Sequence, residues 1–218
     1  RHFTPKLRYT KNAPYSSVKR LGESMQESDH FDELYDRIVK TASCRFAAHD
    51  RLKDHHNASL WTITFFSMGL ITIPLVQTFG LEISFSQNYV NFIQVVLAIV
   101  ILVISVLLNM TNFSVRAEKM HQCAMSLNSI ARRLHRHIND RSGADEYESF
   151  VKEYDDVLQR FDNHSTIDYL YAKNHLSKYY KNSIFFGLYV KSRYFFQFLP
   201  YLFLLGVEAS WLYLMVSK

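Results

Sequence analysis

The sequence has little of the machinery on which soluble enzymes depend. Its six glycines form no phosphate-binding loop, and it contains neither a CxxC pair nor an HExxH motif. It has no nucleophile elbow either. The two cysteines, Cys44 and Cys123, are too few for a disulfide scaffold. These absences favour a protein that is not an enzyme and that uses no cofactor.

Charge is also scarce from Leu60 to Val115, where Glu82 is the only formally charged residue. Two apolar blocks, Trp61–Phe79 and Tyr89–Met110, lie in this stretch and are joined by a short polar segment. A helix needs about 20 apolar residues to cross the hydrocarbon core of a bilayer, and both blocks have about that length. The sequence therefore predicts a transmembrane helical hairpin with spans at about 61–79 and 89–110.

Lysine and arginine are absent from the connection between the spans but frequent at both ends of the hairpin. Those before the first span are Arg45, Arg51 and Lys53, and those after the second are Arg116, Lys119, Arg132 and Arg133. Short flanking segments that carry such basic residues stay in the cytoplasm. We therefore expect a multi-pass membrane protein whose N-terminus is cytoplasmic.

A third apolar run, Phe195–Val216, predicts a third span with an early kink at Pro200. The alternatives are a re-entrant segment and a helix buried in a cytoplasmic domain. Glu208 is the only carboxylate in this run, and an ionisable group inside a membrane is a candidate functional site. Two structural roles compete: a helix contact at its small neighbours Gly206 and Ser210, or a position near the outer interface.

The segments on either side of the hairpin have the apolar spacing of packed helices. In residues 29–60, steps of four and three link Phe31, Tyr35, Ile38, Ala42, Arg45, His49 and Leu52. After the second span, the same steps link Met120, Ala124, Leu127, Ala131, Leu134 and Ile138. Such heptads predict that both spans continue into the cytoplasm as a coiled-coil stalk.

Further helices are expected between the stalk and the third apolar run. The RSG sequence at 141–143 ends the second stalk helix, and residues 144–161 form the next one. Ser165 then caps a short helix in which Asp168 completes a capping box. The predicted fold class is an all-α membrane protein: a transmembrane helical hairpin extended by a cytoplasmic helical stalk, with a third C-terminal span. We divide it into a basic flexible tail (1–28), a core (29–180, with cytoplasmic helices 29–60 and 111–180) and a C-terminal extension (181–218).

Polar residues form a stripe along each span of the hairpin. The stripe on the first span contains Thr64, Ser67 and Thr78, and the stripe on the second contains Asn91, Gln94, Ser105 and Asn109. At 3.6 residues per turn, the second stripe occupies an arc of roughly 60°. Polar groups in hydrocarbon must face protein or water. Hydrogen bonding between helices explains the stripes, and so does a water-filled pore lined by one stripe from each subunit.

Two other groups of residues carry further hypotheses. The N-terminal tail has no acidic residue among its first twenty, and its candidate contacts to anionic lipid or nucleic acid are Lys6, Arg8, Lys11, Lys19 and Arg20. A solvated tail that binds nothing is the alternative. Pairing of the stalk helices brings His49 towards His121, but no local spacing supports a metal site, and none is predicted.

Three blocks of sequence together resemble the SLATT domain family. They are RFAAHDRLKDHHNASLWT at 45–62, NFSVRAEKMHQCAMSLNSIARRL at 112–134 and FDNHSTIDY at 161–169. The resemblance implies a two-span membrane effector of prokaryotic conflict systems in the inner membrane. Such effectors are proposed to form pores that kill the infected cell. The long C-terminal addition is most similar to the branch associated with reverse transcriptases, while other branches accompany nucleotide-signal synthases.

The sequence and the resemblance together lead to one functional hypothesis and two alternatives. We expect an oligomeric pore-forming effector of an antiviral, abortive-infection system, gated by a signal or partner that acts on the cytoplasmic helices. The first alternative is a membrane-anchored adaptor that recruits a nucleic-acid enzyme such as a reverse transcriptase. The second is nucleic-acid binding through the basic tail. The family pattern transfers no catalytic residue.

Overall fold

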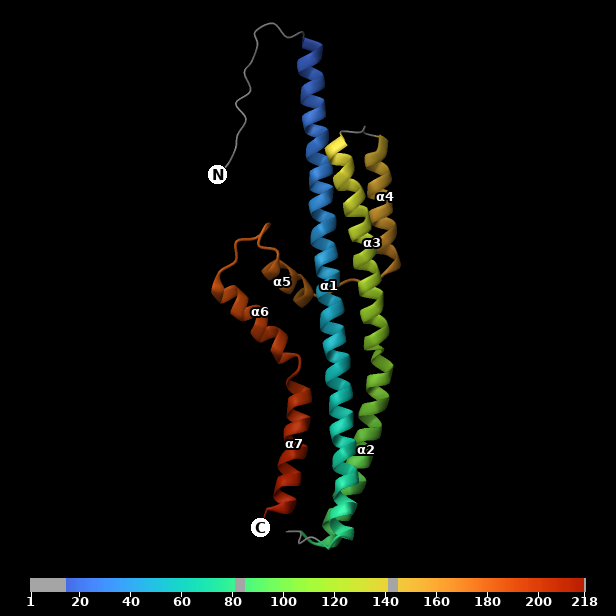
Figure 1. The fold of residues 1–218 in the computed structure, drawn as a ribbon, viewed down its shortest axis with the longest axis vertical. Helices are drawn as coiled ribbons and strands as arrows, with labels where there is room; N and C mark the ends of the chain where they lie inside the picture. The colour runs from blue at the N-terminus through green and yellow to red at the C-terminus, as the bar shows by residue number, and fades with distance from the viewer. Residues whose placement is uncertain (1–14, 81–84, 141–144, 218) are drawn as a thin grey trace.

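A computed structural model describes residues 15–80, 85–140 and 145–217 of the chain. Every regular element within these ranges is an α-helix, which confirms the predicted fold class. The molecule is elongated, with a long helix at its centre and two groups of helices along its sides (Figure 1).

The central element, α1 (Tyr15–Thr78), joins the first stalk helix and the first span in one helix of 64 residues. At 1.5 Å per residue it is about 96 Å long. It begins at Tyr15, so residues 15–28 of the predicted N-terminal tail belong to this helix. The helix extends that far because no proline interrupts the chain between Pro14 and Pro74.

The second span is α2 (Gln87–Thr111), and the second stalk helix is α3 (Phe113–Asp140). They are separated by Asn112, which adopts the left-handed conformation with φ 47° and ψ 41°. Asparagine tolerates this conformation better than most residues because its short polar side chain can hydrogen-bond locally. The second span therefore continues into the stalk as predicted, but through a break of one residue.

The main hydrophobic core lies between α1 and α3 and is covered by α4 (Asp145–Arg160). The predicted heptad residues that are buried are Phe31, Ile38, Ala42, Arg45, Leu52, Met120, Ala124, Leu127, Ala131 and Leu134. Tyr35, His49 and Ile138 are half-buried. The heptad spacing thus identified the packed faces of both stalk helices. Below, "the stalk" means residues 30–60 of α1 together with α3 and α4.

The C-terminal part forms three helices on the other side of α1 (Figure 1). They are α5 (Thr166–His175), α6 (Ile184–Phe196) and α7 (Leu199–Val216), and α7 contacts α1 beside the hairpin. The chain bends by 53° between α6 and α7. This bend agrees with the early kink predicted at Pro200, which lies in the first turn of α7. Proline lacks an amide hydrogen, and in a continuous helix its ring would clash with the carbonyl of Phe196.

The apolar content of the helices fits a membrane protein. The two helices that contain the predicted hairpin spans are both long and apolar enough to cross a bilayer. The bent pair α6–α7 passes the same test only when its two helices are taken together, as a broken span or a re-entrant loop. The described residues thus contain two helices of membrane-spanning length, or three if the bent pair is one span.

Both cysteines are buried in the stalk and are not joined to each other. Burial, with a smaller contribution from Asp168, raises the pKa of the Cys44 thiol to about 11. Burial also raises the pKa of Cys123, against a smaller opposite effect of Arg45. Neither thiol is therefore ionised near neutral pH.

Candidate functional site

The predicted polar stripes lie largely on the uncovered surface of the hairpin. Thr64, Thr78, Asn91 and Asn109 are exposed, so neither α7 nor any other described helix covers them. Ser67, Gln94 and Ser105 are half-buried. A surface that exposes polar side chains at membrane depth needs a partner, either another protein surface or water.

Hydrogen bonding within the subunit accounts for part of these stripes. The hydroxyl of Ser67 donates to the Ile63 carbonyl at 2.9 Å, and that of Thr78 donates to the Pro74 carbonyl at 2.7 Å. Gln77 Nε2 donates to Asn91 Oδ1 across the hairpin at 3.0 Å. Among the stripe residues, Asn91 alone has a side-chain bond to the other span within the described part of the chain.

Glu208 of α7 is buried against Gly69 of α1. Glu208 is 2% exposed. A Cβ atom placed on residue 69 would lie 2.0 Å from Glu208 Oε1. Neither carboxyl oxygen has a hydrogen-bond partner among the described residues. Only a glycine at residue 69 leaves room for this carboxyl group.

This contact bears on the structural roles considered for Glu208. The small residue at the helix contact is Gly69 on the first span, because no atom lies within 4 Å of a Cβ built on Gly206. Gly69 is near the middle of the predicted span 61–79, so a membrane crossed by that span would place Glu208 away from the outer interface. An unpartnered carboxyl group at that depth is costly, and it is the strongest intramembrane candidate for function.

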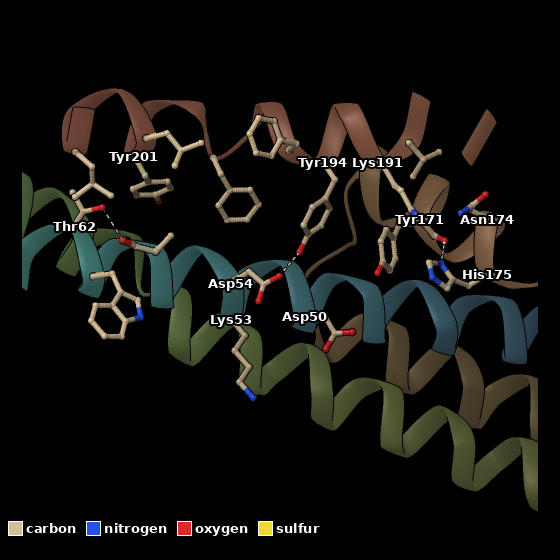
Figure 2. Close-up of a pocket in the computed structure, with 17 residues that line it drawn as sticks. Asp50, Lys53, Asp54, Thr62, Tyr171, Asn174, His175, Lys191, Tyr194 and Tyr201 are labelled. Carbon is tan, nitrogen blue, oxygen red and sulfur yellow. Dashed lines mark hydrogen bonds between the residues drawn. The ribbon is translucent and has the colours of Figure 1, made fainter. Parts of the chain in front are cut away.

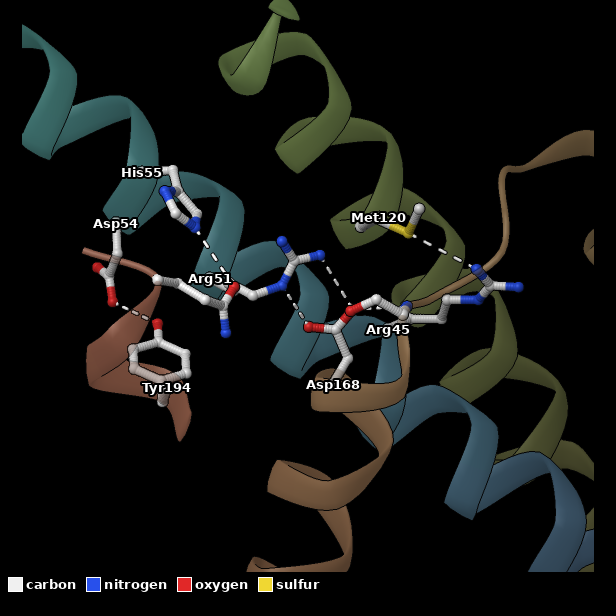
Figure 3. Close-up of polar contacts among 9 residues, drawn as sticks. Arg45, Arg51, Asp54, His55, Met120, Asp168 and Tyr194 are labelled. Atoms are coloured by element: carbon white, nitrogen blue, oxygen red, sulfur yellow. Dashed lines mark hydrogen bonds and ion pairs between the residues drawn. The ribbon is translucent and has the colours of Figure 1, made fainter. Parts of the chain in front are cut away.

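A buried ion pair connects α5 to the stalk (Figure 3). Arg51 Nε lies 2.7 Å from Asp168 Oδ1, and Arg51 Nη2 lies 3.1 Å from Oδ2. The Ser165 amide and hydroxyl also donate to Oδ2, at 2.8 and 2.7 Å, which confirms the capping box. Asp168 is 1% exposed, so these four bonds replace its contact with water.

Arg45 forms a hydrogen bond with the segment that connects α4 to α5. It is buried, it donates to the Asp162 carbonyl, and its Nη1 lies 3.7 Å from Met120 Sδ (Figure 3). The heptad spacing placed Arg45 in the stalk seam without explaining an arginine there. The Asp162 carbonyl supplies that explanation, since a buried guanidinium needs acceptors.

His55 of α1 lies beside two helix breaks, the one between α2 and α3 and the one between α6 and α7. Its ring stacks on Phe198, between α6 and α7, at 4.5 Å and on Phe113, the first residue of α3, at 5.4 Å between centroids. Nε2 lies 3.5 Å from Gln197 Oε1, and Nδ1 lies 3.4 Å from the Tyr201 hydroxyl. A neutral imidazole protonated on Nε2 satisfies both partners, because it donates to the amide and accepts from the phenol.

Burial lowers the pKa of His55 below its ordinary value of 6.5, and Arg51 adds to this, while the Gln197 bond and Asp54 oppose it. Because the unfolded chain then binds the proton more tightly, the contribution of His55 to folding stability is fully present above about pH 6.5 and decreases on acidification.

We expect thermal unfolding of the detergent-purified protein to occur at lower temperature at pH 5.5 than at pH 7.5. His55→Phe should reduce this difference and His56→Phe should not. An equal pH dependence in both variants would contradict the assignment to His55.

His49 and His121 lie close together as expected, whereas the side chains of the basic tail are outside the described residues. The rings of His49 and His121 lie 4.9 Å apart, but no group of three metal-ligating side chains occurs among the described residues. Lys6, Arg8 and Lys11 lie outside the described residues. Lys19 and Arg20 lie within α1, and their side chains are likewise outside the description.

Comparison with known proteins identifies one family. A family model described as SMODS and SLOG-associating 2TM effector domain family 5 matches residues 27–215. The matched region includes the stalk, the hairpin and the bent helices α6 and α7. Comparison with curated proteins and with solved structures finds no match.

Proposed function

Because this chain belongs to SMODS and SLOG-associating 2TM effector domain family 5 (a SLATT family), we propose that it is an oligomeric pore-forming membrane effector of an antiviral system. The family supports the coarser statement, since it is a two-transmembrane effector domain. The observation that carries the finer one is the exposed polar stripe at Thr64, Thr78, Asn91 and Asn109. In an oligomer, such stripes would line a water-filled path.

The proposal places the pore in the inner membrane of a prokaryote, with the stalk in the cytoplasm. A signal or partner acts on the stalk, where Arg51–Asp168 and His55 connect α5, α6 and α7 to α1. Binding there must favour one of two arrangements of the spans. We propose a reverse transcriptase or a nucleotide-signal synthase as the source of that signal, with nucleic acid as a further partner for Lys6, Arg8 and Lys11.

A membrane-anchored adaptor is the second candidate, and one observation favours it. The hydroxyls of Ser67 and Thr78 bond to carbonyls of their own helix, so these residues do not require water. In that case the hairpin only anchors the stalk, and the stalk recruits the partner enzyme. We propose no catalytic role in either case, since the sequence contains no convergent set of catalytic groups.

Membrane potential distinguishes the two candidates. Cells that produce the protein with its activating system should depolarise, and Gln94→Leu combined with Asn109→Leu should strongly slow this, because the stripe on the second span loses two of its four polar side chains. Val106→Leu is the matched control, since Val106 is an exposed apolar residue of the same helix. Toxicity without depolarisation would reject the pore, and unchanged depolarisation in the double variant would reject this lining.

A further inference from the structure

A cavity of about 870 Å³ lies between α1 and the C-terminal helices (Figure 2). One wall is the face of α1 from Asp50 to Thr62. The opposite walls come from α5, from α6, and from the first two turns of α7. Its volume is within the range of cavities that bind small molecules.

The lining of this cavity changes from polar to apolar along α1. Charged and polar groups, among them Asp50, Lys191 and His175, line the end towards the stalk. Trp61 and Leu205 line the other end. Asp50 and Thr62 are separated by about 18 Å at 1.5 Å per residue. Since Trp61 begins the first span, the cavity extends from the stalk past the membrane interface, where tryptophan is common.

The polar end carries balanced charge. Its lining contains the carboxylates of Asp50 and Asp54 and the ammonium groups of Lys53 and Lys191. Asp54 Oδ2 accepts a hydrogen bond from the Tyr194 hydroxyl at 2.7 Å. Burial, and then this bond, raise the pKa of Tyr194, so that its phenol remains neutral. A ligand that matches this end carries one positive and one negative group.

These features together describe an amphiphile with a zwitterionic head and a long apolar chain. We propose that the cavity binds one glycerophospholipid with a primary ammonium head group, of the phosphatidylethanolamine class, drawn from the adjacent leaflet. The ammonium lies near Asp50, the phosphate near Lys191, and an acyl chain follows Trp61 and Leu205 into the membrane. This site goes beyond the proposed function, because a pore and an adaptor would both hold such a lipid.

A bound lipid at this position would connect the helices on the two sides of the cavity. It would contact α1, α5, α6 and α7 together, and it would cover Phe198 at the break between α6 and α7. Phe198 stacks on His55, so a lipid that contacts Phe198 would also affect the position of the His55 ring. The lipid would therefore hold the bent helix pair against the central helix.

Native mass spectrometry of the full chain in detergent tests the proposal with dioleoyl phosphatidylethanolamine and dioleoyl phosphatidylglycerol at equal concentration. The wild type should retain one phosphatidylethanolamine per subunit. Leu205→Trp should weaken this retention about tenfold, the loss expected when about two methylene groups of the chain are displaced. Leu214→Trp is the matched control, because Leu214 is exposed on α7 and does not line the cavity.

A second pair of variants tests the head-group assignment. Lys191→Glu should weaken retention of phosphatidylethanolamine, whereas Lys181→Glu, outside the cavity, should not. Circular dichroism checks that each variant keeps its helices. Equal lipid retention by Leu205→Trp and wild type would overturn the site, and a preference for phosphatidylglycerol would overturn the zwitterionic ligand. These measurements require no membrane potential, so failure of the pore hypothesis would leave their outcome unchanged.

Discussion

An Asp168→Ala variant is expected to lose about 3–5 kcal/mol of stability, the usual cost of removing one partner of a buried ion pair. Asp168 is 1% exposed and accepts bonds from Arg51 and from the Ser165 amide and hydroxyl. Alanine leaves these donors without their acceptor in a site with little access to water. The capping box of α5 also loses its carboxylate, although its N-cap residue Ser165 remains.

Hydrogen exchange and thermal unfolding of the detergent-purified protein measure this effect. Exchange should accelerate most strongly in residues 166–175, because α5 loses both the carboxylate of its capping box and its ion pair with α1. Glu33→Ala is the matched control: it breaks the exposed Arg37–Glu33 pair and should cost no more than about 1 kcal/mol. Equal losses in the two variants would mean that the buried pair does not fix α5.

Gly69→Ala is expected to destabilise the contact between α1 and α7 by about 1–3 kcal/mol, as overpacking of an ordered contact does. The new Cβ would lie 2.0 Å from Oε1 and 3.1 Å from Cδ of Glu208, so the buried Glu208 side chain must leave its position in the contact. Gly206→Ala, on α7 itself, meets no atom within 4 Å. That control should be neutral or stabilising by up to about 1 kcal/mol, because alanine favours the helix.

A double variant tests whether Glu208 is the cause. All three atoms nearest to the added Cβ belong to the Glu208 side chain, so Glu208→Ala removes the clash. Gly69→Ala combined with Glu208→Ala should therefore be more stable than Gly69→Ala alone, with a coupling energy of about 1–3 kcal/mol. Thermal unfolding followed by circular dichroism gives both values. Additive effects would show that the two residues do not touch.

Local patterns in the sequence predicted the features that depend on neighbouring residues. Apolar run length located the hairpin, and steps of four and three identified the buried faces of α1 and α3, including Leu127 and Leu134. The spacing of Ser165 and Asp168 predicted the cap of α5. Each of these follows from the geometry of one helix, or of two helices joined by a short turn.

Contacts between distant segments could not be predicted in the same way. Arg51 and Asp168 are separated by 117 positions, and the local sequence around either residue does not indicate that the other is its partner. The pairing of Gly69 with Glu208 depends on how α7 lies against α1, which the bend at Gln197 decides. Two features of the sequence did indicate that distant contacts exist. One is the arginine Arg45 at a position of the apolar seam, and the other is Glu208, a single carboxylate in an apolar run.

Burial of both native thiols makes the chain unusually convenient for mapping its sidedness. Cys44 and Cys123 are 4% and 0% exposed, and burial raises the pKa of both. Maleimides react with thiolates, so the folded wild-type protein should remain unlabelled at neutral pH. A single cysteine introduced at exposed Ile184 or Phe79 would then be the only reactive site, and a membrane-impermeant maleimide applied to intact cells would report on which side of the membrane it lies.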